Sequence, residues 1–284
     1  MKRITFEKYQ GNGNDFIIVD SRFSRIHDEI RLSESASISK LCDRHYGIGA
    51  DGIIFIVEAK RENDAGMIIY NSDNTEAEMC GNGIRCLIEY LHLKNSKQKS
   101  EYKIETKAGL KVAEYKNGKI TVKMGNPVLD MKNIPTNISD TKCGIPTMRF
   151  KADSFESTGY AVGMGNPHLI FFIDDLDSVD HKKIGPLLEN NNYFPEKTNV
   201  HFCQIIDRNN IKIKVWERGA GSTLACGTGA CSVHVAAYKL DLCNSLTSIH
   251  LPGGTLSIEW SEDEQVKMTG NSKKIFDGSF ILNV

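Results

Sequence analysis

The sequence has no hydrophobic run long enough to cross a membrane. Its longest unbroken apolar stretch is Leu169–Ile173, far shorter than the roughly 20 residues that a spanning helix needs. The charged first residues contain no apolar signal-peptide segment, so we expect no signal peptide. Blocks of like charge and basic patches are also lacking, which argues against binding to nucleic acid or to a membrane surface. We therefore expect a soluble, cytoplasmic globular protein.

Cysteine pairs at redox or zinc-binding spacing are lacking as well. The chain has eight cysteines, but the spacings Cys80–Cys86 and Cys226–Cys231 match neither C-x-x-C nor the usual zinc knuckles. Without a secretory signal, these residues are predicted to be reduced thiols and not a disulfide framework. We expect no bound metal.

What the sequence does contain is an ordinary globular composition. The 284 residues are 40% hydrophobic and 25% charged, with a net charge of −1. A chain of this length has ample core for one large domain or two domains of common size. Composition alone leaves that choice open.

Two stretches share one unusual pattern. Residues 71–86 read NSDNTEAEMCGNGIRC, and residues 217–231 read ERGAGSTLACGTGAC. In each, a polar lead-in of equal length reaches Cys-Gly-polar-Gly, and apolar residues at helical spacing follow. A Gly-Asn loop precedes each stretch at a similar interval, at Gly13-Asn14 and at Gly165-Asn166. The pattern predicts an internal duplication that produces two domains.

The predicted fold class is α+β, with two pseudo-symmetric domains. Each domain is expected to wrap a curved mixed sheet or half-barrel around a central helix, with the active site in the interdomain cleft. The first domain is predicted to span residues 1–126 plus about 272–284, and the second residues 127–271. Besides the two helices that follow Cys80 and Cys226, helices are predicted over residues 33–44 and 175–190.

The two cysteines indicate acid–base chemistry on a carbon atom. A cysteine at a helix N-terminus is expected to have its pKa lowered from about 8.5 towards neutrality, because the amides and the helix dipole favour the thiolate. Inverting a stereocentre requires a base on one face of the carbon and an acid on the other. One thiolate and one thiol satisfy that requirement in both directions. The amides of residues 81–82 and 227–228 are expected to hold a carboxylate at the helix ends.

Four motifs in order resemble those of the diaminopimelate epimerases. They are the loop around Asn14, the stretch from Asn71 to Cys86, Gly165-Asn166-Pro167-His168, and the stretch from Glu217 to Ala230. The resemblance covers residues 4–284. It implies an isomerase, a PLP-independent epimerase without a cofactor, which interconverts LL- and meso-diaminopimelate in lysine and peptidoglycan precursor biosynthesis. It also implies a possible homodimer.

The resemblance assigns roles to individual residues of this sequence. Cys80 and Cys226 are the expected acid/base pair, and His168 and Glu217 are expected to assist catalysis. The expected substrate-binding residues are Asn14, Asn71, Gly81, Asn82, Asn166, Asn199, Glu217, Arg218, Gly227 and Thr228.

Three positions depart from the family pattern. Gly52 stands where many members have Gln, which puts one substrate contact in doubt. Asn74 replaces the glycine of an Asp-Gly-Ser turn and is expected to keep that turn, because Asn tolerates left-handed geometry. Phe276 replaces a tyrosine at the expected dimer contact.

Other readings of the same residues remain open. One rival is another racemase of this fold, of the proline or hydroxyproline type. A second is a hydrolase with Cys226 as its nucleophile, for which Cys80 would be dispensable. A third is a redox or binding protein without enzymatic activity. The remaining cysteines, and His45, His201 and His234, are predicted to be packing or surface residues. A disulfide between Cys80 and Cys226 is a predicted oxidised, inactive form.

Overall fold

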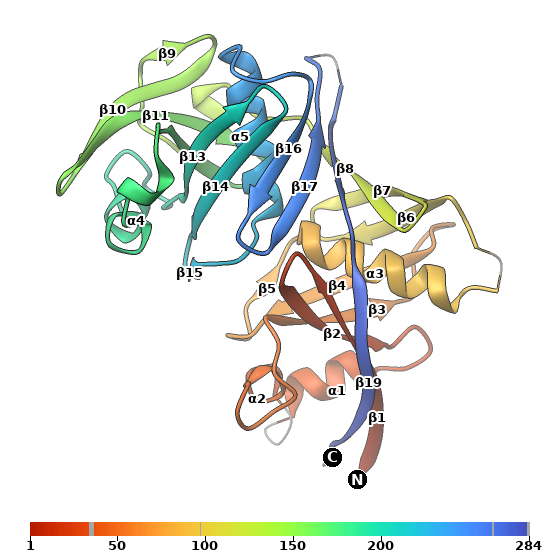
Figure 1. Cartoon of the computed structure of the whole chain (residues 1–284). Helices are drawn as coiled ribbons and strands as arrows, with labels where there is room; N and C mark the ends of the chain where they lie inside the picture. Colours follow the sequence, from red (N-terminus) through yellow and green to blue (C-terminus); the bar gives the residue numbers. More distant parts are fainter. Residues whose placement is uncertain (34–36, 97, 263, 283–284) are drawn as a thin grey trace. The chain divides into compact units, whose positions relative to one another are not determined.

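The computed structural model describes residues 1–33, 37–96, 98–262 and 264–282. The chain forms two compact units (Figure 1). Unit 1 comprises Met1–Val122 and Gly270–Val284, and unit 2 comprises Lys123–Thr269.

Unit 1 contains most of the N-terminal half of the chain and the last strand. Its elements are β1 (Lys2–Gly11), β2 (Asn14–Asp20), α1 (Ile26–Leu32), α2 (Ile38–Cys42), β3 (Gly52–Val57), β4 (Ala65–Asn71), β5 (Glu76–Ala77), α3 (Gly81–Lys94), β6 (Glu101–Thr106), β7 (Gly109–Lys116), β8 (Lys119–Gly125, which runs past the unit boundary) and β19 (Lys273–Leu282).

Unit 2 contains the remaining elements. They are the short 3-10 helix η1 (Met131–Asn133), β9 (Thr141–Lys142), β10 (Ile145–Ala152), β11 (Phe155–Gly163), β12 (Pro167–Phe172), a second 3-10 helix η2 (Leu176–Ser178), α4 (His181–Glu189), β13 (Asn199–Asp207), β14 (Asn210–Glu217), β15 (Gly221–Ser222), α5 (Gly227–Lys239), β16 (Leu246–Leu251), β17 (Gly254–Glu259) and β18 (Val266–Gly270).

The strand pairing of one unit repeats in the other. In unit 1, β19, β1 and β2 pair antiparallel, β2 pairs parallel with β3, β3 antiparallel with β4, and β4 parallel with β6. In unit 2, β10, β11 and β12 pair antiparallel, β12 parallel with β13, β13 antiparallel with β14, and β14 parallel with β16. Each series continues into an antiparallel hairpin, β6–β7 and β16–β17. The predicted α+β fold with a duplicated mixed sheet is confirmed.

One apolar helix occupies the concave side of each sheet. In unit 1, α3 packs against β1, β2, β3 and β19, and in unit 2, α5 packs against strands that include β11, β12, β16 and β17 (Figure 1). Most residues of both helices are buried. A helix that is buried on nearly all sides is held by its surroundings more than by its own propensity.

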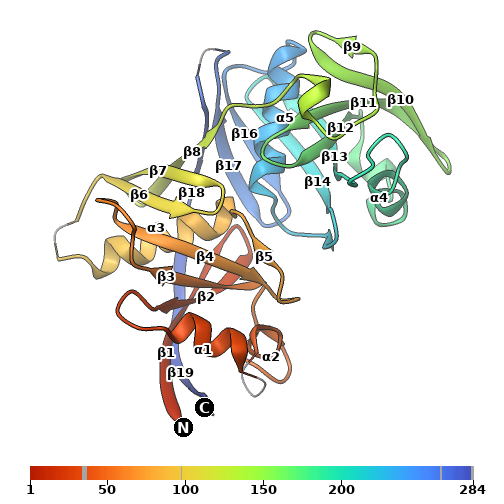
Figure 2. The same cartoon turned by 180° about the vertical axis from the view of Figure 1, so that it is seen from behind.

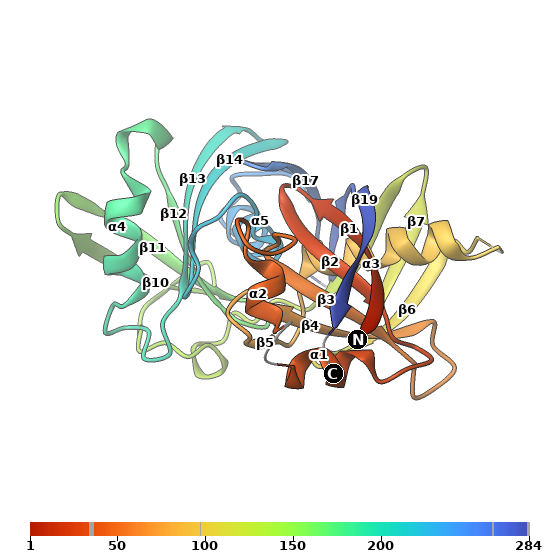
Figure 3. The same cartoon turned by 90° about the horizontal axis from the view of Figure 1, so that it is seen from below.

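The opposite sheet faces carry further helices. In unit 1, α1 and α2 cover apolar side chains such as Ile17 and Phe55 (Figure 2). In unit 2, α4 buries Ile184 and Leu188 against β13 and β14 (Figure 3). Each sheet therefore has apolar residues on both faces, which explains the unbroken apolar run of β12.

The last strand closes unit 1. β19 pairs with β1 along nearly its whole length, so that the two ends of the chain lie side by side (Figure 3). At the other edge of β1, the hairpin to β2 turns through Asn12 and Gly13, which have φ of 55° and 81°. Two consecutive positive φ values are typical of the hairpin turns whose twist matches the strands.

Several predicted elements differ from the observed ones. The helix predicted over residues 33–44 is shorter: α2 covers Ile38–Cys42, and residues 34–36 lie outside the described residues. The sequence reasoning missed α1. The helix predicted over residues 175–190 is also shorter, because Asp180 caps α4 through the amides of Lys182 and Lys183. In the described part of the chain, no helix has the length and apolar character that crossing a bilayer requires.

Candidate active site

Cys80 occupies the N-cap of α3, as predicted. Its backbone is extended, and its sulfur accepts a hydrogen bond from the amide of Gly83 at 3.4 Å. The first amides of a helix have no carbonyl partner within the helix. The side chain of Cys80 is half-buried, unlike those of most neighbouring helix residues. Its thiol is therefore the polar group that the sequence presents at the positive end of α3.

A chain of polar groups surrounds Cys80. The Oδ1 atom of Asn14 lies 3.8 Å from the Cys80 sulfur and accepts a hydrogen bond from Nδ2 of Asn82 at 3.3 Å. Asn14 in turn donates to the carboxylate of Asp51 at 2.6 Å. Three of the sequence-predicted residues of unit 1 are thus adjacent. Asp51, which sequence reasoning did not single out, orients one of them.

Arg85 is the largest fully buried side chain of unit 1. Its guanidinium donates to Oδ1 of Asn82 at 2.9 Å, to Oδ1 of Asn12 at 2.8 Å and to the carbonyl of Gly81 at 3.2 Å. A buried cation of this kind is tolerated because its donors are satisfied. The role of Arg85 in holding Asn82 was missed, although the residue lies in the motif.

Another predicted residue of unit 1, Asn71, lies at the exposed end of β4 and donates to Thr75 at 2.9 Å. Asn74 between them has φ of 71°, which confirms that it keeps the left-handed turn expected there. Gly52 is explained by packing, because a Cβ atom at this position would lie 2.5 Å from the carbonyl oxygen of Tyr70. This backbone leaves no room for a side chain at residue 52.

Cys226 occupies the equivalent place in unit 2, at the N-cap of α5. Only 4% of its surface is exposed, and its sulfur lies 3.7 Å from the hydroxyl of Thr228. Gly229 packs close by, since a Cβ atom there would lie 3.0 Å from the sulfur. Cys80 and Cys226 therefore share a position in the fold but differ in exposure.

The expected lowering of the Cys226 pKa is wrong. Burial and the nearby Glu217 carboxylate raise the pKa of this thiol well above its usual value, and they outweigh the opposing effects of Thr228 and the Gly229 amide. Removal from water penalises the charged thiolate more than a helix end favours it. Burial and the Glu217 carboxylate therefore favour the neutral thiol of Cys226.

Two buried histidines and a partly exposed asparagine form a hydrogen-bonded chain beside Cys226. Nδ1 of His168 lies 2.9 Å from Nε2 of His201, and Nε2 of His168 lies 2.7 Å from Oδ1 of Asn166. Both rings are fully buried. Burial lowers the pKa of His201 to about 3 and places the pKa of His168 well below its usual value, where His201 and Arg218 add to the effect. His201, predicted to be a packing residue, is a hydrogen-bonded member of the site.

Asn199 and Arg218 lie together at the end of β14. The Oδ1 atom of Asn199 accepts from the backbone amide of Arg218 at 3.0 Å, and its Nδ2 donates to the carbonyl of Pro167 at 2.9 Å. Glu217 accepts from the hydroxyl of Thr223 at 2.5 Å. The predicted residues of unit 2 are therefore held close to one another through backbone contacts.

A glutamate from α4 supports this loop. Glu189 is buried, and its carboxylate accepts from Nε1 of Trp216 at 2.7 Å and from the amide of Gly219 at 3.0 Å. These bonds hold the side chain of Trp216 and the backbone of Gly219, on either side of Glu217 and Arg218. No local signal in the sequence marks Glu189 as a partner of this loop.

His168, His201 and Cys226 offer ligand atoms within 4.8 Å of one another. Their atom types suit a soft metal such as zinc. However, the two nearest ring nitrogens share a hydrogen bond and therefore point at each other, not at a common centre. The geometry is that of a hydrogen-bonded chain.

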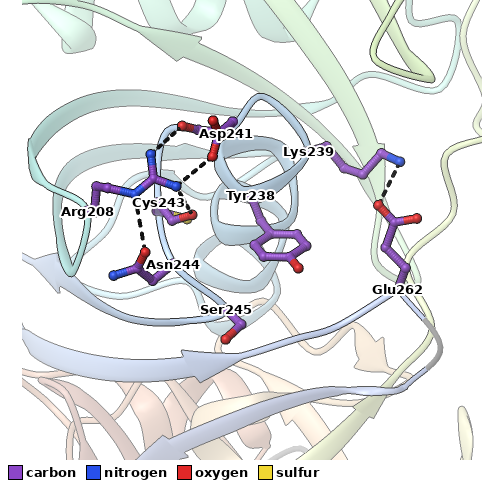
Figure 4. Close-up of a pocket in the computed structure, with 8 residues that line it drawn as sticks. All are labelled: Arg208, Tyr238, Lys239, Asp241, Cys243, Asn244, Ser245 and Glu262. Carbon is purple, nitrogen blue, oxygen red and sulfur yellow. Dashed lines mark hydrogen bonds and ion pairs between the residues drawn. The ribbon is translucent and has the colours of Figure 1, made fainter.

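A separate pocket of about 590 Å³ lies at the other end of α5 (Figure 4). Its charged groups are paired, Arg208 with Asp241 and Lys239 with Glu262. Cys226 caps the start of α5, whereas the pocket surrounds its end, about 20 Å further along the helix at 1.5 Å per residue. The pocket contains none of the predicted site residues.

Several solved structures share the fold of this chain. One is a predicted epimerase from Pseudomonas aeruginosa, with a TM-score of 0.71 and 12% identity, which covers 99% of this chain and 100% of that one. Another is a hydroxyproline epimerase from Agrobacterium vitis, with a TM-score of 0.64 and 13% identity, which covers 99% and 91%. The chain therefore shares its fold with these proteins.

Comparison of sequences identifies the family to which this chain belongs. The family model described as diaminopimelate epimerase matches residues 6–129 and 160–275. The diaminopimelate epimerase of Prochlorococcus marinus (strain NATL1A) is 46% identical over 276 residues, which are 96% of this chain and 97% of that protein. That of Trichodesmium erythraeum (strain IMS101) is 43% identical over 96% and 98%. The chain belongs to the diaminopimelate epimerase family, and it is an isomerase.

Proposed function

We propose that this chain interconverts LL- and meso-diaminopimelate by a two-base mechanism with Cys80 and Cys226 as the acid/base pair. The observation that carries the proposal is the repeated position of the two thiols, each at the N-cap of the central helix of its unit. The family's reaction serves the synthesis of lysine and of peptidoglycan precursors. We propose no cofactor for it.

The proposed step moves one proton off the α-carbon and another onto it. A thiolate takes the α-proton and becomes a thiol, and the electron pair of the C–H bond is delocalised onto the substrate carboxylate. The other thiol then gives its proton to the opposite face of the carbon and becomes a thiolate. Because burial and Glu217 favour the neutral thiol of Cys226 in the structure without substrate, Cys226 acts as the acid in the direction described, and Cys80 acts as the base. The reverse direction exchanges the roles.

The substrate carboxylate is proposed to lie against the helix N-termini. The first-turn amides at residues 81–82 and 227–228 have no carbonyl partner within their helices. Hydrogen bonds from these amides, and the dipoles behind them, would stabilise the negative charge that develops in the transition state. The proposed partners of the rest of the substrate are Asn14, Asn71, Asn166, Asn199, Glu217 and Arg218, with His168 and Glu217 assisting.

The two units are proposed to act as epimerase domains. We place the functional boundaries at residues 1–126 plus about 272–284, and at residues 127–271. We also propose a homodimer that uses β19, where Ile275, Phe276 and Ile281 expose roughly half of their surfaces. Light scattering on the purified protein tests the dimer, and a mass equal to one chain would contradict it.

The central test is turnover of LL-diaminopimelate in deuterated water by fully reduced protein. We expect the meso isomer to form with one deuterium at the inverted α-carbon. Cys80→Ala and Cys226→Ala should each lower kcat at least a thousandfold, because each removes an acid/base group. Cys143→Ala, at an exposed cysteine, is the matched control and should leave turnover unchanged.

The same assay distinguishes the proposed reaction from the alternative functions. Conversion of proline or hydroxyproline instead of diaminopimelate would favour a racemase of the other type on this fold. Full activity of the Cys80→Ala variant would remove the two-base mechanism and point to a single nucleophile.

A further inference from the structure

The chain of Asn166, His168 and His201 has a defined direction. Both rings are buried away from water, and a neutral imidazole carries a single N–H. The side-chain oxygen of Asn166 only accepts hydrogen bonds, so Nε2 of His168, at 2.7 Å, must carry the proton of that ring. Nδ1 of His168 is then an acceptor. Nε2 of His201, at 2.9 Å, must therefore be the donor to it.

The His201 end of this series of hydrogen bonds is consistent with the same direction. In the tautomer just derived, Nδ1 of His201 carries no hydrogen. This atom is buried and has no hydrogen-bond partner among the described residues. The reverse direction would place an N–H group there, and buried donors without partners are rarer than under-satisfied acceptors.

The parallel strands β12 and β13 set the geometry. They lie side by side, with His168 opposite Asn199 and Ile170 opposite His201 (Figure 3). His201 also contacts the start of α5, since a Cβ atom at residue 229 would lie 2.2 Å from its Cε1. The ring is therefore wedged between the sheet and the first turn of the helix that begins after Cys226.

We propose that His201 is a positioning residue that fixes the hydrogen-bond order from His201 through His168 to Asn166, so that Asn166 presents its amide N–H groups to a carboxylate of the substrate. Asn166 is partly exposed, and its oxygen is engaged by His168. The donor end of the amide is left for a ligand. The hydrogen bonds from His201 to Asn166 therefore favour a ligand that places a hydrogen-bond acceptor at this position, such as the carboxylate of an amino acid.

The inference rests on the proposed role of Asn166 in substrate binding, but the order of donors can be measured without substrate. Long-range ¹H–¹⁵N spectra of protein labelled at histidine distinguish the two neutral tautomers. We expect both His168 and His201 to carry the proton on Nε2 between pH 6 and 8. A proton on Nδ1 of His168 would overturn the proposal whatever the substrate is.

Kinetics then test the consequence. His201→Phe keeps a ring but removes the N–H donor, and we expect it to raise the KM for LL-diaminopimelate about tenfold while kcat changes little. His201→Gln, whose amide nitrogen can replace Nε2, should restore KM to within about threefold of the unmodified protein. Equal KM values for the two variants, or a loss confined to kcat, would contradict the positioning role.

A double-mutant cycle guards against a general loss of packing. In an Asn166→Ala background the His201→Phe change should have no further effect on KM, because the group that it positions is absent. An undiminished effect in that background would assign His201 a merely structural role. If the Nε2–H tautomers are found but diaminopimelate is not a substrate, the donor chain stands and the proposed function fails.

Discussion

At the scale of single residues, Glu189 lies outside the candidate site but binds the loop that carries two of its predicted residues. It lies on α4, yet its carboxylate accepts two hydrogen bonds from the segment that carries Glu217 and Arg218. Both contacts are at normal hydrogen-bond length, and the carboxylate is buried. A buried acceptor that binds two donors is costly to replace, because any donor left without it loses its partner.

We predict that Glu189→Gln weakens substrate binding. One side of the glutamine amide is a donor and would face Trp216 or Gly219, so one of the two bonds is lost. The expected result is a several-fold rise in KM for diaminopimelate and a drop in stability of about 1–3 kcal/mol. Glu156→Gln, at an exposed ion pair with Arg149, is the control and should change neither quantity. An unchanged KM for Glu189→Gln would show that the loop does not depend on this contact.

At the scale of elements, the first turns of α3 and α5 differ in how closely other atoms pack around their glycines. Gly83 and Gly229 stand three residues after Cys80 and Cys226, at equivalent positions. A Cβ atom at residue 83 would meet its nearest neighbour, a flexible isoleucine methyl, at 3.1 Å. At residue 229 it would lie 2.2 Å from the ring of His201. The two helix starts therefore share a motif but not the same surroundings.

Gly229→Ala is expected to be much more harmful than Gly83→Ala. The added methyl group must displace His201 or the Cys226 thiol, and overpacking of this kind costs about 1–3 kcal/mol. We expect Gly229→Ala to lose most of its kcat and Gly83→Ala to keep a substantial part. Turnover and thermal unfolding of both variants, compared side by side, give the answer. Equal losses would mean that His201 is not wedged at this turn.

At the scale of the whole molecule, stability depends on histidines buried without charge. The pKa of His201 is lowered to about 3 and that of His234 to about 4, in both cases by burial. The unfolded chain binds a proton at each of these sites below about pH 6.5, whereas the folded chain does not. The free energy of unfolding is therefore highest above pH 6.5. It decreases as the pH falls from 6.5 towards the pKa values of these histidines in the folded chain.

We predict that unit 2 loses about 1.4 kcal/mol of unfolding free energy per pH unit for each such histidine below pH 6. Both tryptophans of the chain, Trp216 and Trp260, lie in unit 2 and report its unfolding in urea. His201→Gln should flatten the pH dependence, while His45→Gln, at an exposed histidine, should not. An identical slope in both variants would contradict the assignment.

Much of the fold and of the site could be predicted from local patterns. Cys80 and Cys226 were placed at helix starts because a Gly-polar-Gly sequence before apolar residues at helical spacing encodes such a start. The duplication was visible because the Gly-Asn loops and the cysteine stretches recur in one order. Asn74 was assigned its turn from its own conformational preference. These features depend on residues that are neighbours in the chain.

Other features depend on residues that only folding brings together. Helix α4 begins later than predicted because Asp180 caps it, and α1 has no strong periodic signal in the sequence. The roles of Arg85, Glu189 and Asp51 follow from contacts made across elements. The direction of the Cys226 pKa was mispredicted, because the helix end is encoded locally whereas burial is not.

The sequence by itself thus determined the family, the repeat and the position of Cys80 and Cys226 at two helix starts, since each is carried by short motifs in fixed order. Tertiary structure alone decided that the Cys226 thiol is buried, which raises its pKa, and that His201 is hydrogen-bonded to His168. The pairing of β12 with β13 and the packing of α5 against them set both outcomes. Desolvation and hydrogen-bond direction arise from atoms that are distant in the chain, and no local pattern records them.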